Sequence, residues 1–573
     1  MTTTQQTSAA QESTPSAAQR DDFTTHEVFN QPPPLVGYNV YEQDTALREG
    51  VAREGAAWDE PRLREIGAVA GSEEAIASGE QANRYPPELH THDRYGHRVD
   101  EVSFHPAWHE LMRRAVGWGL HAAPWRDPQP GAHVARAAGF LVWSQVESGH
   151  GCPISMTYAA IPALRVEASV AAEWEPRFTS LEYDFGLRAP QTKRGLICGM
   201  GMTEKQGGSD VRANTTRAIP DAADAAGGAS YHLTGHKWFC SAPMSDAFLV
   251  LAQAPSGLTC FLLPRVLPDG ARNHIFIQRL KDKLGNRSNA SSEIELREAW
   301  AMRVGDEGRG VRTIIEMVNS TRLDCIAGSA ALMRQAVAQA THHAAHRAAF
   351  GRTLIDQPLM TSVLADLAIE SEAATTLLLR LAAARDHAAG EAGDPHEAAL
   401  LRLGVAIGKF WVCKRAETLA AEAMECLGGA GYIEESIMPR LYRETPVNAI
   451  WEGSGNVIAL DVLRALSREP ESAEALLAEI ALAHGASATL DDAIVRLRRE
   501  LADPADAELR ARRVVELMAL TLQASLLARH APAAVSDAFI AARLGEQRSL
   551  SFGALPASAD TRAIVERARP MAG

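Results

Sequence analysis

Hydrophobic and polar positions divide this chain into stretches with different periodicities. Near 311–348, 358–390 and 395–427, apolar residues recur at three- and four-residue spacing, which predicts three long helices. Their length and short connections predict an antiparallel bundle. Between about 195 and 305, short aliphatic and aromatic runs are separated by Gly, Pro, Asn and Asp, which predicts a small antiparallel β domain.

The remaining stretches complete an α+β, mostly α, organisation. Residues from about 35 to 185 predict helices broken by loops, and the His-containing stretch 90–97 predicts a polar surface loop, since its spacing matches no common metal-ligand pattern. The expected parts are a disordered N-terminal tail (1–27), an N-terminal helical domain (28–194), the β domain (195–305), a C-terminal helical bundle (306–460) and a helical C-terminal extension (461–573).

Composition narrows the function classes. A length of 573 residues predicts several domains, and the net charge of −14 gives no general affinity for nucleic acid or an anionic membrane. The seven cysteines are scattered without a C-x-x-C pair, which predicts neither disulfides nor a zinc site and favours a cytoplasmic protein. No run is apolar and long enough to predict a membrane span, and the first twenty residues do not resemble a secretory signal.

The stretch from Gly201 to Ala213 is the strongest candidate for a ligand loop. It combines a threonine, a serine, acids and two adjacent glycines, and glycine lets the main chain approach a flat polar ligand closely. The stretch resembles the first signature of the acyl-CoA dehydrogenase family, whose order of helices, β domain and helical bundle also matches. The resemblance implies FAD as cofactor, with contacts from Met200, Gly201, Met202, Thr203, Gly207, Gly208 and Ser209.

A second segment, His236 to Ser241, resembles the family's Lys-Trp motif. In the family the tryptophan lies against the flavin ring and the following residues bind its edge, which implies contacts from Trp238, Phe239, Cys240 and Ser241. The alternative is an amphipathic strand with a core tryptophan.

A third segment resembles the family's Arg-x-x-Phe-Gly element, at Arg347, Phe350 and, further on, Gln357. In the family these residues reach the FAD of a neighbouring subunit, so the resemblance implies a homotetramer built as a dimer of dimers. A guanidinium suits a pyrophosphate. The alternative is a solvated arginine at a helix C-terminus.

The fourth segment resembles the second signature and the catalytic turn. It implies cofactor contacts from Gly428, Gly429, Ile450, Trp451, Gly453, Ser454, Gly455 and Asn456, and it places the catalytic base at Glu452. The carboxylate takes the α-proton of an acyl-CoA thioester while the β-hydrogen leaves as hydride to the flavin. Burial would raise the pKa of this base towards the operating pH. The alternative is an acid at a helix N-terminus.

Isovaleryl-type members carry the base on the residue before an arginine in the first long C-terminal helix. Arg322 matches that arginine, and the resemblance places it at the substrate. Thr321 precedes it, so Glu452 is the base that the family pattern supports. We expect the bulk of Trp451 to narrow the acyl pocket, so efficient oxidation of long chains is not implied.

Segments around 30–34, 104–109, 202–209 and 451–456 resemble the AidB branch, which is associated with the bacterial response to DNA alkylation. In that branch the tail is linked to double-stranded DNA, which implies contacts from Arg464, Arg498, Arg499, Arg512 and Arg513. The extension lacks lysine and has a net charge of −2, so ion-paired helix faces are the alternative. Three functions stay open: an acyl-CoA dehydrogenase-type enzyme, a DNA-associated protective flavoprotein with little or no dehydrogenase activity, and a flavoprotein without a catalytic role.

Overall fold

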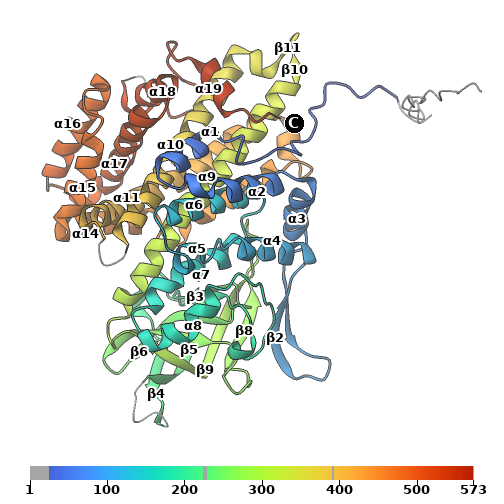
Figure 1. The fold of residues 1–573 in the computed structure, drawn as a ribbon, viewed down its shortest axis with the longest axis vertical. Helices are drawn as coiled ribbons and strands as arrows, with labels where there is room; N and C mark the ends of the chain where they lie inside the picture. Colours follow the sequence, from blue (N-terminus) through green and yellow to red (C-terminus); the bar gives the residue numbers. More distant parts are fainter. Residues whose placement is uncertain (1–24, 223–228, 390–392, 547, 572–573) are drawn as a thin grey trace, which may run out of the picture.

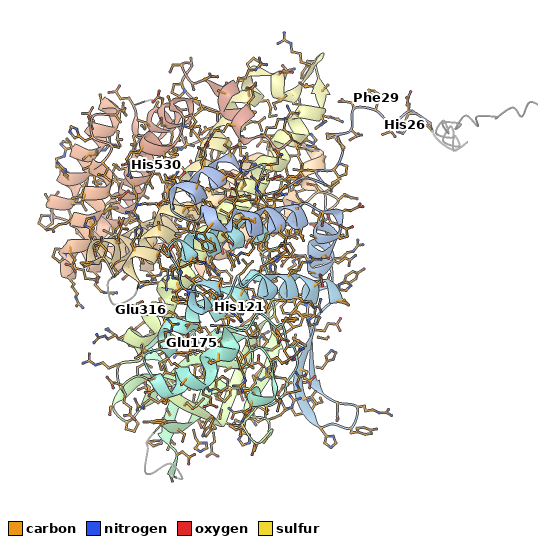
Figure 2. The ribbon with its side chains drawn as sticks, in the orientation of Figure 1. His26, Phe29, His121, Glu175, Glu316 and His530 are labelled. Carbon is orange, nitrogen blue, oxygen red and sulfur yellow. The ribbon has the colours of Figure 1, made fainter. Side chains whose placement is uncertain are left out.

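The computed structural model describes residues 25–222, 229–389, 393–546 and 548–571. Helices form one end of the molecule and a single large sheet forms the other (Figure 1), which confirms the predicted fold class. Residues 1–24 of the predicted N-terminal tail (1–27) lie outside the described residues. The segment carrying His26 and Phe29 projects from the body (Figure 2), and Phe29 is 78% exposed. Across the described ranges, no helix is both long and apolar enough to cross a membrane.

The N-terminal domain is helical with one hairpin. Its elements are α1 (Thr45–Arg53), α2 (Glu60–Ala70), α3 (Glu73–Arg84), β1 (Glu88–His92), β2 (Arg98–Ser103), α4 (Pro106–Gly117), α5 (Ala123–Arg126), α6 (Ala132–Ser144), α7 (Gly151–Leu164) and α8 (Ala168–Phe178). Every residue of α6 is buried.

The β1–β2 hairpin corrects the prediction that residues 90–97 are simply a loop. The strands pair antiparallel, and the Asp93 carboxylate accepts hydrogen bonds from the backbone N–H groups of Tyr95 and His97 to close the turn. Strand β1 alternates between exposed and half-buried residues, so it lacks the apolar face that would have marked it.

The β domain contains β3 (Cys198–Gly201), β4 (Arg217–Pro220), β5 (Ser230–Ser241), β6 (Ala247–Ala254), β7 (Gly257–Pro264), β8 (Ile275–Leu280) and β9 (Ser291–Val304). The strand order is β3-β6-β4-β5-β9-β7, with β8 on β9. Most pairs are antiparallel, as predicted, but β3 pairs with β6 in parallel, and β4 meets β6 in parallel at Arg217 and Gln253. Parallel neighbours need a crossover connection, which short-range alternation cannot reveal.

The bundle confirms the three long helices: α9 (Gly310–His346), α10 (Pro358–Ala388) and α11 (Pro395–Cys426). Proline occupies the first position of α10 and α11, and the Asp394 carboxylate caps α11 by accepting from the N–H of His396. The hairpin β10 (Ala348–Ala349) and β11 (Arg352–Thr353) follows α9, and the bundle continues with α12 (Gly429–Tyr432), α13 (Met438–Ile450) and α14 (Gly455–Arg468).

The C-terminal extension is helical, as predicted, and packs against α10 and α11. It contains α15 (Pro470–Ala481), α16 (Ala488–Ala502), α17 (Ala507–His530), α18 (Ala533–Leu544) and α19 (Thr561–Ala568). Its apolar residues join the core cluster of the bundle and the N-terminal domain. Buried ion pairs cross the boundary, with Arg543 Nε 2.8 Å from Glu370 Oε2 and Arg567 Nη2 3.0 Å from Glu372 Oε1.

Candidate functional site

The turn between α13 and α14 carries Glu452, and three helices hold its backbone. Glu452 has a φ of 57°, a backbone conformation that residues other than glycine rarely adopt. Its carbonyl accepts from Arg322 Nε of α9 at 3.0 Å, and Arg322 Nη1 lies 2.8 Å from Asp461 Oδ2 of α14. Lys409 of α11 donates to the carbonyl of Gly453. The turn is therefore fixed from three sides, and Arg322 positions the residue that was predicted as the base.

The Glu452 carboxyl group is buried and incompletely satisfied. Burial raises its pKa, while the Thr321 hydroxyl and the charges of Arg322 and Lys409 oppose that rise. Within the described part of the chain, Glu452 Oε2 has no hydrogen-bond partner. A desolvated carboxyl with a free oxygen can exchange a proton with a group that enters beside it.

Trp451 precedes Glu452 and is partly buried. Its Nε1 donates to Asn448 Oδ1 at 3.1 Å, and Asn448 Nδ2 donates to Ser329 Oγ at 3.1 Å, so the indole orientation is fixed. The ring packs against an apolar cluster that includes Met156 of α7 and Met317 of α9. The surroundings of Glu452 on this side are therefore apolar.

The loop after β3 is organised by a buried ion pair that the sequence analysis did not single out. Glu204 and Lys237 are both fully buried, and Lys237 Nζ lies 2.9 Å from Glu204 Oε1. The Glu204 carboxylate also accepts from the backbone N–H and hydroxyl groups of Thr215 and Thr216 at 2.6 to 3.1 Å. Coulombic attraction to Lys237 and these hydrogen bonds outweigh burial and hold the pKa of Glu204 well below its usual range. Glu204 lies in the first signature and Lys237 in the Lys-Trp motif. The signal in the sequence that could have predicted their pairing was an acid in the loop followed by a lysine in the next long strand.

The predicted ligand residues of this loop lie at the surface beside Trp238. The Thr203 carbonyl accepts from the backbone N–H of Trp238 at 2.8 Å. A Cβ at Gly208 would lie 2.3 Å from Thr203 Oγ1, and Gly207 has a φ of 129°, so both glycines are required by the loop. The exposed residues of the loop include Gly207, Gly208 and Ser209. Met202 packs against the same apolar cluster as Trp451. Met200 and Gly201 belong to β3.

Trp238 is half-buried and carries cations beside its ring. Lys281 Nζ lies 3.4 Å from the ring centroid of Trp238 and 4.6 Å from that of Phe239, which is 50% exposed. Two residues further on, Cys240 is fully buried and burial raises the pKa of its thiol to about 12. Ser241 Oγ lies 3.3 Å from Ser291 Oγ. The motif thus presents an aromatic surface with a polar, cationic margin.

A second group of predicted cofactor residues lies away from this site within one chain. Arg347, Phe350 and Gln357 lie around the β10–β11 hairpin, at the end of the molecule opposite the sheet (Figure 1). Arg347 Nη1 donates to the carbonyl of Asn30 at 2.6 Å, and Gln357 Nε2 to that of Ala349 at 3.0 Å, while Phe350 is 99% exposed. Their contact with the FAD of a neighbouring subunit stays a prediction.

The remaining predicted cofactor residues flank α12 and the turn. Gly428 has a φ of 61°, which only glycine adopts freely, and no heavy atom lies within 4 Å of a Cβ built at Gly428 or Gly429. Ile450 is 66% exposed at the end of α13. Ser454, at the start of α14, and Asn456 are exposed, and Gly455 is buried against Lys414.

The arginines predicted to contact DNA have different surroundings. Arg513 pairs with Glu500 at 3.0 Å, Arg512 donates to Asn456 Oδ1 at 2.9 Å, and Arg464 lies 3.7 Å from Asp461. In the described extension, Arg498 and Arg499 are exposed on α16 and form no ion pair.

Comparison with known proteins identifies three family profiles along the chain. The AidB N-terminal domain matches residues 30–185, the acyl-CoA dehydrogenase middle domain residues 199–299, and the acyl-CoA dehydrogenase C-terminal domain residues 308–467.

Individual relatives agree with these matches. The chain is 50% identical over 488 residues to AidB of Escherichia coli (strain K12), covering 84% of this chain and 88% of that protein. It is 33% identical to acyl-CoA dehydrogenase family member 11 of Caenorhabditis elegans, over 68% of this chain and 64% of the relative. The solved structure of Caenorhabditis elegans ACDH-11 in complex with C11-CoA superposes with a TM-score of 0.81 at 27% identity, covering 96% of this chain and 95% of that one. The chain therefore belongs to the acyl-CoA dehydrogenase family, within its AidB branch.

Proposed function

We propose that this chain is an FAD-dependent acyl-CoA dehydrogenase-type oxidoreductase with Glu452 as its catalytic base. The observation that carries the proposal is the buried Glu452 carboxyl group, whose Oε2 has no partner in the described structure, on a turn fixed by α9, α11 and α14. An isolated buried carboxyl is costly unless a bound molecule uses it.

The residues present fit a flavin. Thr203 and Trp238 adjoin through a backbone hydrogen bond, and the loop beside them keeps glycine where a Cβ would collide with Thr203 Oγ1. An isoalloxazine needs an apolar face and polar edges, and the Trp238 ring with the exposed loop amides offers both. We infer that Arg347 and Gln357 serve the FAD of a second subunit in a homotetramer, because their hairpin lies at the end of the molecule opposite the sheet that carries Trp238 (Figure 1).

Each residue then has a defined role. Bound flavin supplies a hydride acceptor for the β-hydrogen of an acyl-CoA. Glu452 takes the α-proton, and its raised pKa makes it a stronger base than an exposed glutamate. Arg322 and Lys409 hold the backbone of the turn, and Trp451 excludes water from it. Acyl-CoA as the substrate class is supported by the relative solved with C11-CoA.

An anaerobic titration tests this function. We expect the purified protein to be yellow and at least one acyl-CoA, from a panel of increasing chain length, to bleach its absorbance near 450 nm. Trp451 beside the base favours short chains over long ones. If the protein contains FAD but no acyl-CoA bleaches it, the protein is a flavoprotein without this activity, and the proposed dehydrogenase function is refuted.

A second candidate function is association with double-stranded DNA as a protective flavoprotein in the response to DNA alkylation. The observation that favours it is the exposure of Arg498 and Arg499 on α16, where neither forms an ion pair in the described structure. A guanidinium group that forms no ion pair within the protein can bind a DNA phosphate without breaking an existing contact. The seven cysteines are free and buried, which suits a reducing cytoplasm, where such a role would operate.

For DNA binding we expect the double substitution Arg498→Gln/Arg499→Gln to reduce the slope of log K against log salt by about 2, since each phosphate contact contributes about one. Duplex binding is measured by fluorescence anisotropy across a salt series. Arg513→Gln is the matched control, because Arg513 already pairs with Glu500. Absent binding at low salt, or an unchanged slope in the double variant, would refute this role.

A further inference from the structure

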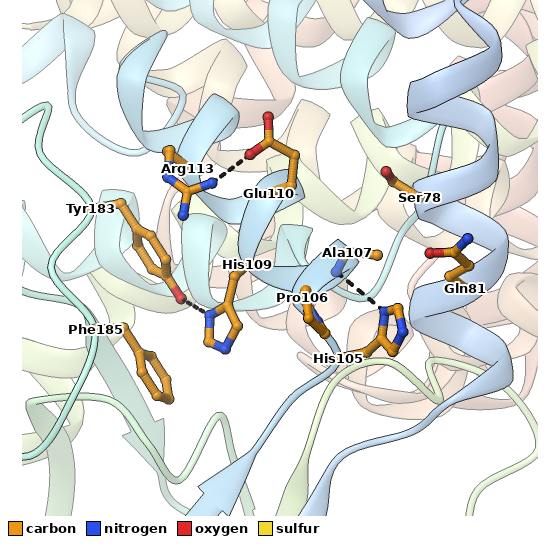
Figure 3. Close-up of a pocket in the computed structure, with 10 residues that line it drawn as sticks. All are labelled: Ser78, Gln81, His105, Pro106, Ala107, His109, Glu110, Arg113, Tyr183 and Phe185. Carbon is orange, nitrogen blue, oxygen red and sulfur yellow. Dashed lines mark hydrogen bonds and ion pairs between the residues drawn. The ribbon is translucent and has the colours of Figure 1, made fainter.

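A pocket in the N-terminal domain is separate from the Glu452 turn and from the ligand loop. It has a volume of about 780 Å³ and lies between α3, the beginning of α4 and the segment around Tyr183 and Phe185 (Figure 3). Its volume is within the range of small-molecule sites. The segment 104–109, which resembled the AidB branch, supplies His105 and His109 to its lining, and the proposed dehydrogenase function gives these residues no role.

The protonation state of His109 follows from its surroundings. Its Nδ1 lies 2.8 Å from the Tyr183 hydroxyl (Figure 3). Burial raises the pKa of Tyr183, so the hydroxyl keeps its proton, and burial together with the Arg113 charge lowers the pKa of His109, so the imidazole is neutral. The hydroxyl therefore donates to Nδ1, and the remaining ring proton is on Nε2.

His105 has the same tautomer for a different reason. It precedes α4, and its Nδ1 accepts from the backbone N–H of Ala107 at 3.2 Å, which leaves a proton on Nε2. Within the described residues, neither Nε2 of the two histidines has a hydrogen-bond partner. The pocket thus contains two ring N–H donors, Nε2 of His105 and Nε2 of His109, and a hydrogen bond at Nδ1 orients each ring.

The pocket is lined by one guanidinium group and one carboxylate. Glu110 is the one carboxylate that lines it, and that carboxylate is shared by Arg113 and by Arg114, whose Nε lies 2.9 Å from Glu110 Oε1. Arg113 has a side-chain exposure of 60% and is free to reach a ligand with its remaining N–H groups. The N–H groups of Arg113 that Glu110 does not use, next to the histidine donors, favour an acceptor with a negative charge.

Phe185 adds an aromatic surface to the lining beside His109 (Figure 3). Phe185 is 37% exposed and meets the His109 ring edge to face, with centroids 4.6 Å apart at an interplanar angle of 70°. An exposed phenylalanine that is held by a neighbouring ring offers a flat face at a small entropic cost.

We propose that this pocket binds a small planar aromatic carboxylate. The ring packs against Phe185, and the carboxylate accepts from the Nε2–H group of His109 and from Arg113, which lies one turn further along α4. No bond is made or broken in this step, so the pocket is a binding site and is independent of the flavin chemistry.

Calorimetry of the holoprotein with 2-naphthoate tests the proposal. We expect saturable binding of 2-naphthoate, and binding at least about tenfold weaker for 2-naphthamide, which lacks the charge, and for cyclohexanecarboxylate, which lacks the aromatic ring. The affinity should be the same in the Glu452→Gln variant and with saturating acyl-CoA, because the two sites are separate. Loss of binding in either condition would place the ligand at the acyl site and overturn the proposal.

Two exposed variants localise the binding. Arg113→Gln should weaken it about tenfold and Phe185→Leu about fivefold, whereas Arg94→Gln, an exposed arginine on the β1–β2 turn, should leave it unchanged. Absent binding of 2-naphthoate to the wild type at millimolar concentration, or equal affinities in all three variants, would refute the pocket as its site. Flavin reduction by acyl-CoA is measured in parallel, so failure of this proposal and failure of the dehydrogenase remain distinguishable.

Discussion

Replacing Glu452 with glutamine is expected to slow flavin reduction by an acyl-CoA about 10³-fold, because the amide cannot take the α-proton and a positioned general base contributes about 10²- to 10⁴-fold. Stopped-flow absorbance under anaerobic conditions measures the rate. In the wild type the rate should fall as pH drops through the Glu452 pKa, which burial holds above the ordinary glutamate value, because only the ionised carboxylate accepts the proton. The glutamine variant should lose this acidic limb.

A relocated carboxylate provides the matched control. The Thr321 hydroxyl of α9 donates to the Val318 carbonyl and contributes to lowering the pKa of Glu452. Thr321 occupies the position where isovaleryl-type relatives carry their base. The double variant Glu452→Gln/Thr321→Glu should recover part of the lost rate, since it restores a carboxylate beside the same space. A glutamine variant that reduces flavin as fast as the wild type would show that the base is elsewhere.

The second large effect is expected from Glu204→Ala. The substitution leaves the fully buried Lys237 ammonium without its carboxylate, and breaking a buried pair in this way costs about 3–5 kcal/mol. We expect the midpoint of urea unfolding to fall accordingly and the FAD content of the purified protein to fall with it, since Glu204 orders the loop that carries Thr203. Both are measured on the same preparation, by circular dichroism and by flavin absorbance.

The double variant Glu204→Leu/Lys237→Met separates charge from packing. It removes both charges, so it should be more stable than Glu204→Ala. Because folding lowers the pKa of Glu204, its contribution is present above the ordinary glutamate pKa and is lost as pH falls below that value towards the folded-state pKa. Equal stability of Glu204→Ala and the wild type would mean that the pair contributes nothing to the fold.

The periodicity of apolar residues was sufficient to predict the elements whose structure depends on local sequence pattern. The helices α9, α10 and α11 have apolar residues at helical spacing, and their bounds differ from the predicted ones by at most two residues. The β1–β2 hairpin was not predicted because β1 has no buried residue and β2 buries a single apolar residue, Val102. The parallel placement of β3 beside β6 depends on a crossover between segments about fifty residues apart, which alternation within one strand does not encode.

Motifs located the candidate site but not the contacts that hold it. Glu452 and Trp238 were predicted from the family resemblance, whereas the anchoring of the turn by Arg322 and Lys409 required the packing of three helices. Glu204 was visible only as an acid in a loop, because a buried ion pair depends on two segments that meet in space. The role of Arg347 depends on a second subunit and stays a prediction.

The arginines of the extension bear on how this protein can be dissected. Arg543 and Arg567 neutralise Asp366, Glu370 and Glu372, acids on the buried side of α10. A chain cut at residue 461 would leave Asp366 and Glu372 without their arginines and Glu370 with Arg415 of α11 alone, and it would expose the apolar surface beneath them. We therefore expect the extension and the bundle to unfold as one cooperative unit. Removing the extension would destabilise the bundle, so a loss of ligand binding after truncation could not be assigned to the extension itself. Surface substitutions are the variants that can assign it a role.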